Sequence, residues 1–240
     1  MGNTNEVDAG RITSGIEPDT LRLKIVNFIY QQLPAWRDDP NRPDEQSEVK
    51  LNSQLATFLD VQARSSFSMI RFNHEEPQFG SRSVDISSLP SKRMLINAKH
   101  YTIYNPVLVI ECKRLPSPPP KDREKEYVTG SVPNKKRGGI QRFKLGLHGA
   151  KHDLAVMVGY IQGSSAKALH KAVNKWIFEL VDKPLGDGNS WSKKEILLQL
   201  EEDVKVGVVK YYSNHSRKGK AEGIELYHLW ITMKKKLGTA

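Results

Sequence analysis

The sequence predicts a mixed α/β fold in which helices cover both sides of a central β-sheet. Two helical segments come first, strand-like segments begin near residue 67, and helices and strands then alternate to the end. Apolar residues make up 38% of the 240 residues, which is enough for one core. The sequence therefore predicts one domain over residues 17–240. Residues 1–16 are small and polar and are expected to be disordered.

The N-terminal helices are predicted from capping residues and from rows of apolar side chains. A helix over residues 19–33 begins at a capping Asp-Thr pair, and Pro34 is expected to end it. The turn-rich residues 38–43 separate it from a second helix over about residues 44–62.

The remaining elements follow from alternation, apolar runs and turn signals. Strands are expected over residues 67–73, 82–87, 102–113, 154–161, 204–212 and 224–233. Further helices are expected over residues 138–147, 164–182 and 192–202. Residues 44–182 would then form the core, and residues 192–233 a C-terminal helix and β-hairpin.

The net charge of +10 is unevenly distributed along the chain. Residues 1–62 carry 10 acidic and 6 basic side chains, whereas residues 63–240 carry 17 acidic and 31 basic ones. This excess indicates a polyanionic partner, although ordinary solubility charge is the simpler alternative. The single cysteine excludes an internal disulfide and a cysteine-based zinc site, and a reducing, cytoplasmic setting is expected. No signal peptide or membrane span is predicted.

The most informative segment is Glu111-Cys112-Lys113, which directly follows an apolar run over residues 107–110. Strand alternation places the glutamate and the lysine on one face and turns the cysteine toward the core. A charged pair at the end of a buried strand is costly unless it is used, and an exposed salt bridge on the sheet is the alternative. Upstream, no Asp or Glu occurs between Asp85 and Glu111. Alone, Asp85 could simply sit in a turn at a strand end.

Two further polar residues can join this pair. Glu48 lies in one helical row with Leu51, Leu55 and Leu59, so it is expected to point inward, unless it only interacts with the helix dipole. Gln141 lies on the polar side of a short helix, where it could orient a water or catalytic group. The alternative is that it belongs to an ordinary polar helix surface.

These residue types suit the hydrolysis of a phosphodiester by a bound Mg²⁺, which activates water and stabilises charge on phosphorus. Asp85 and Glu111 would supply oxygen ligands, together with the backbone carbonyl of Cys112. Lys113 would lie beside the attacking water and stabilise the transition state. Glu48 would bind a second ion or orient water, and Mn²⁺ could substitute for Mg²⁺.

The same residues resemble the PD-(D/E)XK nuclease superfamily over residues 44–182. The resemblance implies a restriction-endonuclease-like fold in which Asp85 and Glu111 bind the metal and Lys113 is the catalytic lysine. It implies that Glu48 is an auxiliary carboxylate and Gln141 a polar residue of the active site. Two departures stand out, because Ser83-Val84 replaces the proline of the motif and the 25-residue gap requires a long β-hairpin between the strands.

Substrate contacts are expected from the loop over residues 114–144, which holds nine basic and three acidic side chains. Such side chains position nucleic-acid phosphates without specifying a sequence. The residues expected to bind nucleic acid are Arg114, Lys135, Lys136, Arg137, Arg142 and Lys144.

We therefore expect a Mg²⁺-dependent nuclease, acting on DNA rather than RNA. The resemblance implies a setting in restriction, phage defence or DNA processing, with targeting supplied by a homodimer or a protein partner. Two alternatives remain open. One is a catalytically inactive nucleic-acid-binding module on the same fold, and the other is a scaffold that binds only proteins.

Overall fold

The structure, a computed structural model, describes residues 20–78, 80–96, 98–119, 121–219 and 222–233. The expectation of disorder for residues 1–16 lies outside these ranges, as does the lysine-rich segment 234–236.

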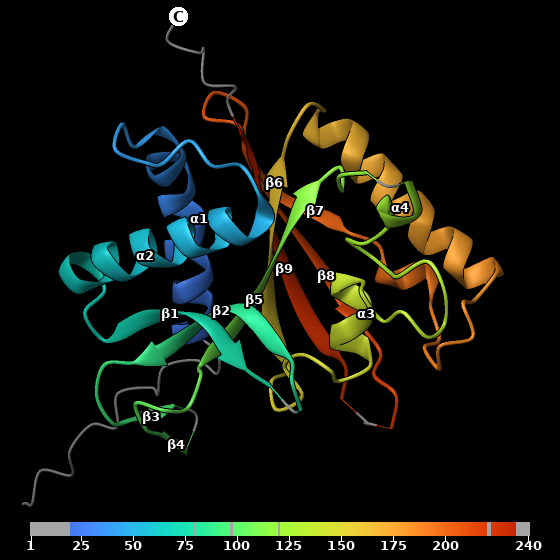
Figure 1. Ribbon diagram of the computed structural model, residues 1–240. Helices are drawn as coiled ribbons and strands as arrows, with labels where there is room; N and C mark the ends of the chain where they lie inside the picture. Colours follow the sequence, from blue (N-terminus) through green and yellow to red (C-terminus); the bar gives the residue numbers. More distant parts are fainter. Residues whose placement is uncertain (1–19, 79, 97, 120, 220–221, 234–240) are drawn as a thin grey trace, which may run out of the picture.

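The described residues build a seven-stranded mixed sheet with helices on both faces (Figure 1), so the predicted fold class is confirmed at this level. The strand order is β1-β2-β5-β6-β9-β8-β7, and β5, β6 and β9 are parallel to one another. The helices are α1 (Thr20–Asp38), α2 (Glu48–Ser66), α3 (Gly139–Lys144) and α4 (Ala166–Asp182), with 3₁₀ turns at Lys121–Arg123 and Lys193–Glu195. The strands of the sheet are β1 (Ile70–Pro77), β2 (Ser83–Pro90), β5 (Leu108–Leu115), β6 (Leu154–Ile161), β7 (Leu198–Asp203), β8 (Val208–His215) and β9 (Ile224–Thr232).

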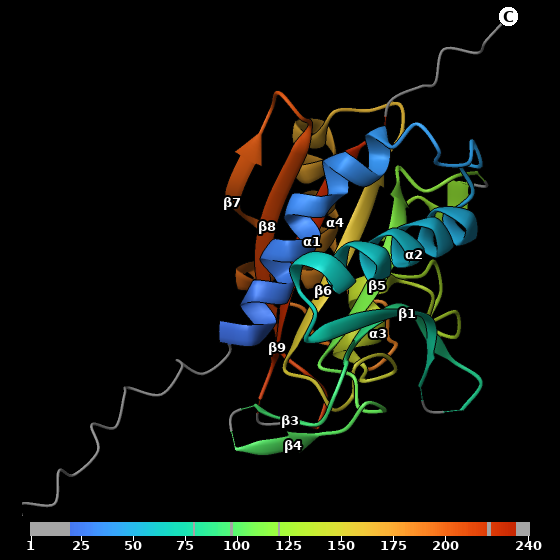
Figure 2. The same cartoon turned by 90° about the vertical axis from the view of Figure 1, so that its left-hand side faces the viewer.

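Two hydrophobic cores lie on opposite faces of this sheet. Helices α1 and α2 cover one face, which Figure 2 shows toward the viewer, and α3 and α4 cover the other. Alternate residues of β5 enter different cores: Ile110 and Cys112 pack toward α1 and α2, whereas Val109 packs toward α3 and α4. Since Glu111 and Lys113 share the face of Val109, the strand directs both charged side chains toward the α3 side.

The strands β2 and β5 pair over a short distance and then separate. Their register joins residues 86–88 to residues 108–110, and β2 makes no ladder pair with β5 beyond Ile86. Asp85 is the first residue past this pairing, so its side chain can turn toward β5. The separation of the two strands therefore creates the place where the acidic residues meet.

The expectation that Pro34 ends the first helix is wrong, because α1 continues to Asp38 with Pro34 inside it. A proline in a helix removes one backbone hydrogen bond. Tertiary contacts of the following turn offset that loss. Trp36 is buried against Tyr160, with ring centroids 5.5 Å apart, and Arg37 donates hydrogen bonds to two backbone carbonyls.

The second helix begins four residues later than expected, at Glu48, and continues to Ser66. Ser47 occupies the N-cap position with an extended backbone. Glu48 is therefore the first helical residue rather than one inside the helix. Its side chain leaves the helix end and reaches the end of β5.

The strand expected over residues 102–113 begins six residues later than expected, because residues 102–107 form a turn before β5. Met94–Ile96 (β3) pairs with Lys99–Tyr101 (β4) in a small hairpin outside the main sheet, and β5 begins only at Leu108. Pro106 lies between them, where it lacks the backbone donor that a strand requires. The long gap between Asp85 and Glu111 is thus filled by the end of β2 and this hairpin.

The short helix expected over residues 192–202 is wrong. Only residues 193–195 form a single 3₁₀ turn, and β7 then runs as an exposed edge strand beside β8. The helix cannot continue because the backbone of Leu197 is used elsewhere. Its N–H donates to Asn174 of α4, and its carbonyl accepts from His170 or Asn174 of the same helix.

A chain of buried polar side chains joins the C-terminal hairpin to the loop before α3. The Trp230 indole donates to the Tyr127 hydroxyl (2.8 Å), which lies 2.8 Å from His228 Nδ1. Ser213 Oγ lies 2.7 Å from His228 Nε2 and 2.7 Å from His215 Nε2. Because an indole can only donate, the Tyr127 hydroxyl is the acceptor in the first of these bonds.

This chain ends at the carboxylate of Glu195, whose Oε2 is 3.5 Å from His215 Nδ1. Burial lowers the pKa of His215, and Lys144 adds to this while Glu195 opposes it. Burial, then His215 and His170, lower the pKa of His228 well below its usual range. Both imidazoles are consequently neutral near pH 7.

We expect the free energy of unfolding to decrease as the pH falls below about 6.5, the ordinary histidine pKa. The unfolded chain then binds protons that the folded His215 and His228 do not, so acid favours unfolding, by at most about 1.4 kcal/mol per pH unit for each histidine. Urea denaturation at pH 7.5, 6.5 and 5.5 measures this slope. His228→Gln should flatten it, and the exposed His100→Gln is the control. An unchanged slope in His228→Gln would contradict the expectation.

Candidate active site

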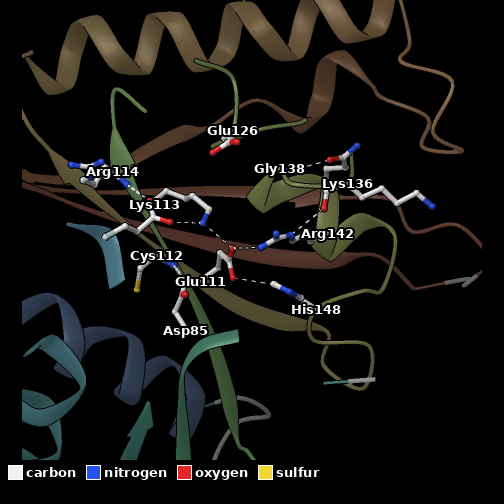
Figure 3. Close-up of polar contacts among 12 residues, drawn as sticks. Asp85, Glu111, Cys112, Lys113, Arg114, Glu126, Lys136, Gly138, Arg142 and His148 are labelled. Carbon is white, nitrogen blue, oxygen red and sulfur yellow. Dashed lines mark hydrogen bonds and ion pairs between the residues drawn. The ribbon is translucent and has the colours of Figure 1, made fainter. Parts of the chain in front are cut away.

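Six charged or titratable side chains converge beside the end of β5 and form what we call the Glu111 cluster (Figure 3). They come from two strands, from the start of α2, and from α3 with the turn that follows it. The members are Glu48, Asp85, Glu111, Lys113, Arg142 and His148.

Glu111 is the centre of this cluster and is only 1% exposed. Its Oε1 lies 3.2 Å from Lys113 Nζ and 3.0 Å from Arg142 Nη1, and its Oε2 lies 3.0 Å from His148 Nδ1. Burial by itself raises the pKa of a carboxyl group, but Lys113, His148 and Arg142 together bring the pKa of Glu111 below its usual range. Glu111 is therefore a buried carboxylate with nitrogen partners at both oxygens.

Lys113 is held between two carboxylates. Its Nζ donates to Glu48 Oε1 at 2.8 Å, while Glu48 Oε2 accepts from the backbone N–H of Arg114 at 3.0 Å. Burial lowers the pKa of an ammonium, but Glu111, Glu48 and Asp85 outweigh this and raise the pKa of Lys113 above its usual range. Lys113 is therefore a permanent cation at neutral pH.

Asp85 reaches β5 through its backbone, because Asp85 Oδ2 accepts from the N–H of Cys112 at 2.7 Å. Burial, followed by the negative charge of Glu111, raises the pKa of Asp85 to about 7. The Cys112 side chain lies in the core on the other face, as the alternation predicted. Burial and then Asp85 raise the pKa of its thiol well above the usual range, which makes it unsuited to act as a nucleophile.

The carboxylate ligands at this site suit Mg²⁺ better than a metal that needs three or more side-chain ligands. In the part of the chain that the structure describes, no three His, Cys, Asp or Glu side chains are arranged to hold a metal ion together. Mg²⁺ commonly uses only one or two carboxylates and completes its shell with water and substrate phosphate. Asp85 and Glu111 are the two carboxyl groups available for that role, and the charge of Glu111 is, after burial, a cause of the raised pKa of Asp85.

Gln141 does not join the Glu111 cluster. Its Oε1 accepts from the backbone N–H groups of Gly130 (3.0 Å) and Gly138 (3.1 Å), and its Nε2 donates to Asp187 Oδ2. The side chain is fully buried and all of these contacts lie in the loop before α3 or in a distant turn. The geometry assigns Gln141 to positioning the loop rather than to the reacting groups.

The expectation that Lys144 binds nucleic acid is wrong. Its side chain is 1% exposed, and Nζ lies 2.7 Å and 2.8 Å from the two carboxylate oxygens of Glu195. It also lies 4.9 Å from the ring centre of Trp191. The helix turns this lysine into the interior, where a buried cation requires a partner, so no phosphate can reach it.

The other basic residues of the loop have different surroundings. Lys135, Lys136 and Arg137 are exposed, and the carbonyl of Lys136 accepts from Arg142 Nε at 3.1 Å. This bond holds the exposed basic segment next to the Glu111 cluster (Figure 3). Arg114 lies at the end of β5 and donates to the carbonyl of Gln46, close to Glu48. These four side chains remain candidates for phosphate contacts.

Two members of the cluster have roles that sequence reasoning missed. Arg142 was expected to face nucleic acid, yet its guanidinium pairs with Glu111. His148 was not among the expected site residues; the helix expected over residues 138–147 ends at Lys144, and the turn that follows brings His148 to Glu111. The glycines at positions 146 and 149, both with positive φ, mark that turn and were the available signal.

Comparison of the chain with protein-family models, curated proteins and solved structures found no match. Among the described residues, no helix has the length and apolar character needed to cross a membrane.

Replacing Gln141 should loosen the loop before α3. We expect Gln141→Ala to leave two buried backbone N–H groups without their acceptor and to lower the free energy of unfolding by about 1–3 kcal/mol. Trypsin should also cut faster near residues 135–137. Urea denaturation and timed proteolysis measure the two effects, with the exposed Gln199→Ala as the control. Unchanged stability and unchanged proteolysis would contradict this role.

Proposed function

We propose that this protein is a Mg²⁺-dependent nuclease that hydrolyses phosphodiester bonds. One observation carries the proposal: two carboxyl groups on separating strands, Asp85 and Glu111, lie beside a lysine that other acids keep charged. Bound between them, Mg²⁺ would supply a water of lowered pKa and neutralise charge on the phosphate. The backbone carbonyl of Cys112 stays a proposed third ligand.

The environment of Lys113 defines what it can do. A lysine whose pKa lies above its usual range cannot accept a proton at neutral pH, so it does not serve as a general base. A fixed ammonium next to the carboxylates instead stabilises negative charge that develops on the phosphate or on the attacking oxygen. Glu48 orients this ammonium through its 2.8 Å bond, which makes Glu48 a positioning residue.

Both carboxylate oxygens of Glu111 already have partners, because Oε1 pairs with Arg142 and Oε2 pairs with His148. A cation that binds Glu111 must therefore exchange with at least one of them. Arg142 is the more mobile candidate because its side chain is 27% exposed, whereas that of His148 is 2% exposed. Released from Glu111, the guanidinium would be free to bind a substrate phosphate.

The proposed fold is restriction-endonuclease-like, with DNA preferred over RNA as the substrate. What supports the fold is the mixed sheet with β2 and β5 separating at Asp85 and helices on both faces. A role in restriction, phage defence or DNA processing, cytoplasmic location, and targeting through a homodimer or a protein partner are further parts of this proposal. Each extends the superfamily resemblance.

A second candidate function is a catalytically inactive nucleic-acid-binding module. The observation in its favour is that both Glu111 oxygens already have nitrogen partners inside the protein. Such a set of ion pairs could persist as a purely structural feature in which no metal binds.

The nuclease proposal predicts metal-dependent cleavage that requires Lys113 and Asp85. With Mg²⁺ or Mn²⁺, we expect the protein to cut at least one of supercoiled plasmid, linear duplex, single-stranded DNA and RNA. Lys113→Met and Asp85→Asn should each lower the rate at least about 100-fold, because each removes a charge at the reacting phosphate. The matched control is Lys167→Met, which alters an exposed lysine on α4. Binding without cleavage of any of these substrates would favour the inactive module.

Metal binding can be tested apart from cleavage through Arg142. We expect Arg142→Gln to tighten Mn²⁺ binding several-fold, because it removes a cation that competes for Glu111. Asp85→Asn should weaken the same binding. Electron paramagnetic resonance of free Mn²⁺ measures both affinities without substrate. The control is Arg137→Gln, an exposed residue of the same loop. Equal affinities in Arg142→Gln and Arg137→Gln would rule out the exchange.

A further inference from the structure

A groove is lined by residues of the β3–β4 hairpin and of the segment over residues 150–153. The hairpin lies well away from α4 (Figure 1). Two cavities of about 310 Å³ and about 550 Å³ form it. Both are lined by the same four residues, so they adjoin and make one continuous groove. The shared residues are Lys99, Tyr101, Lys151 and His152.

The groove carries positive charge that internal acids do not cancel completely. Lys99 and Lys151 are exposed at its surface, and Arg22 at one end pairs with Asp153. Arg217 is buried and donates its N–H groups to three backbone carbonyls, so these bonds orient its charge without neutralising it. The acids Glu76 and Glu222 also line the groove, one in each cavity.

The pKa of His152 reflects the same excess of positive charge. Burial, then Lys99 and Arg22, lower its pKa to about 4, while Asp153 acts in the opposite direction. Two lysine or arginine charges therefore outweigh the nearest carboxylate at this point. His152 itself is a neutral imidazole near pH 7 and adds a polar surface to the groove.

Aromatic side chains accompany these cations. Tyr104 lines the larger cavity and is 77% exposed, so its ring is open to solvent. Tyr101 lies under the Lys99 ammonium, 5.1 Å from its ring centre. Cations for phosphates next to ring faces for bases are the combination with which proteins hold single-stranded nucleic acid.

The groove is joined to the Glu111 cluster by a short stretch of chain. His148 contacts Glu111, and the N–H of the next residue, Gly149, donates to Gln78 Oε1 at 3.0 Å. Gln78 lines the larger cavity together with residues 150–152. The segment from His148 to His152 therefore has one end at the Glu111 cluster and the other at the groove.

We propose that this groove binds an extended single-stranded nucleic-acid segment next to the bond at the Glu111 cluster. The substrate class follows from the lining, because exposed lysines beside an exposed tyrosine offer contacts to phosphates and to an unpaired base. Lys99 and Lys151 would contact phosphates, and Tyr104 would stack on a base. The inference rests on the proposed nuclease function only for the placing of the cut bond, not for the binding itself.

The test uses the full-length protein in EDTA, so that binding is measured without cleavage. The probe is a fluorescent single-stranded 12-nucleotide oligomer, in deoxy and ribo forms, followed by anisotropy at several salt concentrations. Lys99→Glu/Lys151→Glu should weaken binding at least tenfold and lower the salt slope by about 0.7 for each lost phosphate contact. Tyr104→Ala should weaken binding about tenfold with the slope unchanged.

The matched control is Lys167→Glu/Lys171→Glu, which makes the same charge change on exposed lysines of α4. Equal affinities in this control and in the groove variant would overturn the proposal. So would tighter binding of a duplex of the same length, or stronger competition by an acidic peptide than by unlabelled oligomer. Loss of binding in the groove variant alone supports the groove even if the protein never cuts. If the Lys99→Glu/Lys151→Glu variant cleaves nucleic acid and binds the oligomer with unaltered affinity, the groove proposal is wrong and the nuclease proposal stands.

Discussion

The arrangement of the site depends on one physical constraint, the burial of the Glu111 carboxylate. A charge with 1% exposure needs partners, and here they come from β5, from α3 and from the turn after α3. Pairing with Arg142 fixes α3 against the sheet, and the Arg142 bond to Lys136 then fixes the exposed basic segment. Lys113, which balances the charge of Glu111, is itself buried and therefore also needs a partner, which is Glu48.

A second consequence concerns the use of positive charge. The chain carries a net charge of +10, yet several of its cations serve the interior. Lys144 is paired with Glu195, and the N–H groups of Arg217 donate to backbone carbonyls. Exposed cations near the Glu111 cluster and the hairpin groove include the segment over residues 135–137 and the lysines at positions 99 and 151. Net charge therefore does not say which cations are accessible, because burial decides that.

Features with local signals were predictable from the sequence. Strand β6 has the bounds that its apolar run predicts, and α4 begins after Ser165, whose side chain accepts from the N–H of Ala168 as a helix cap does. Strand alternation likewise separated Cys112 from its charged neighbours. Features that depend on distant partners were not predictable. Helix α1 continues past Pro34 because Trp36 packs against Tyr160. No helix forms after Leu197 because its backbone N–H donates to Asn174 of α4.

The sequence by itself determined the mixed α/β class, the two-residue spacing of Glu111 and Lys113, and the isolation of Asp85 upstream. Each of these follows from alternation and composition, which act over a few residues. The tertiary structure alone decided that Arg142 and His148 contact Glu111, that Gln141 fixes a loop, and that Lys144 is buried. Those outcomes depend on how segments far apart in the chain compensate buried charge, and no local pattern encodes that compensation.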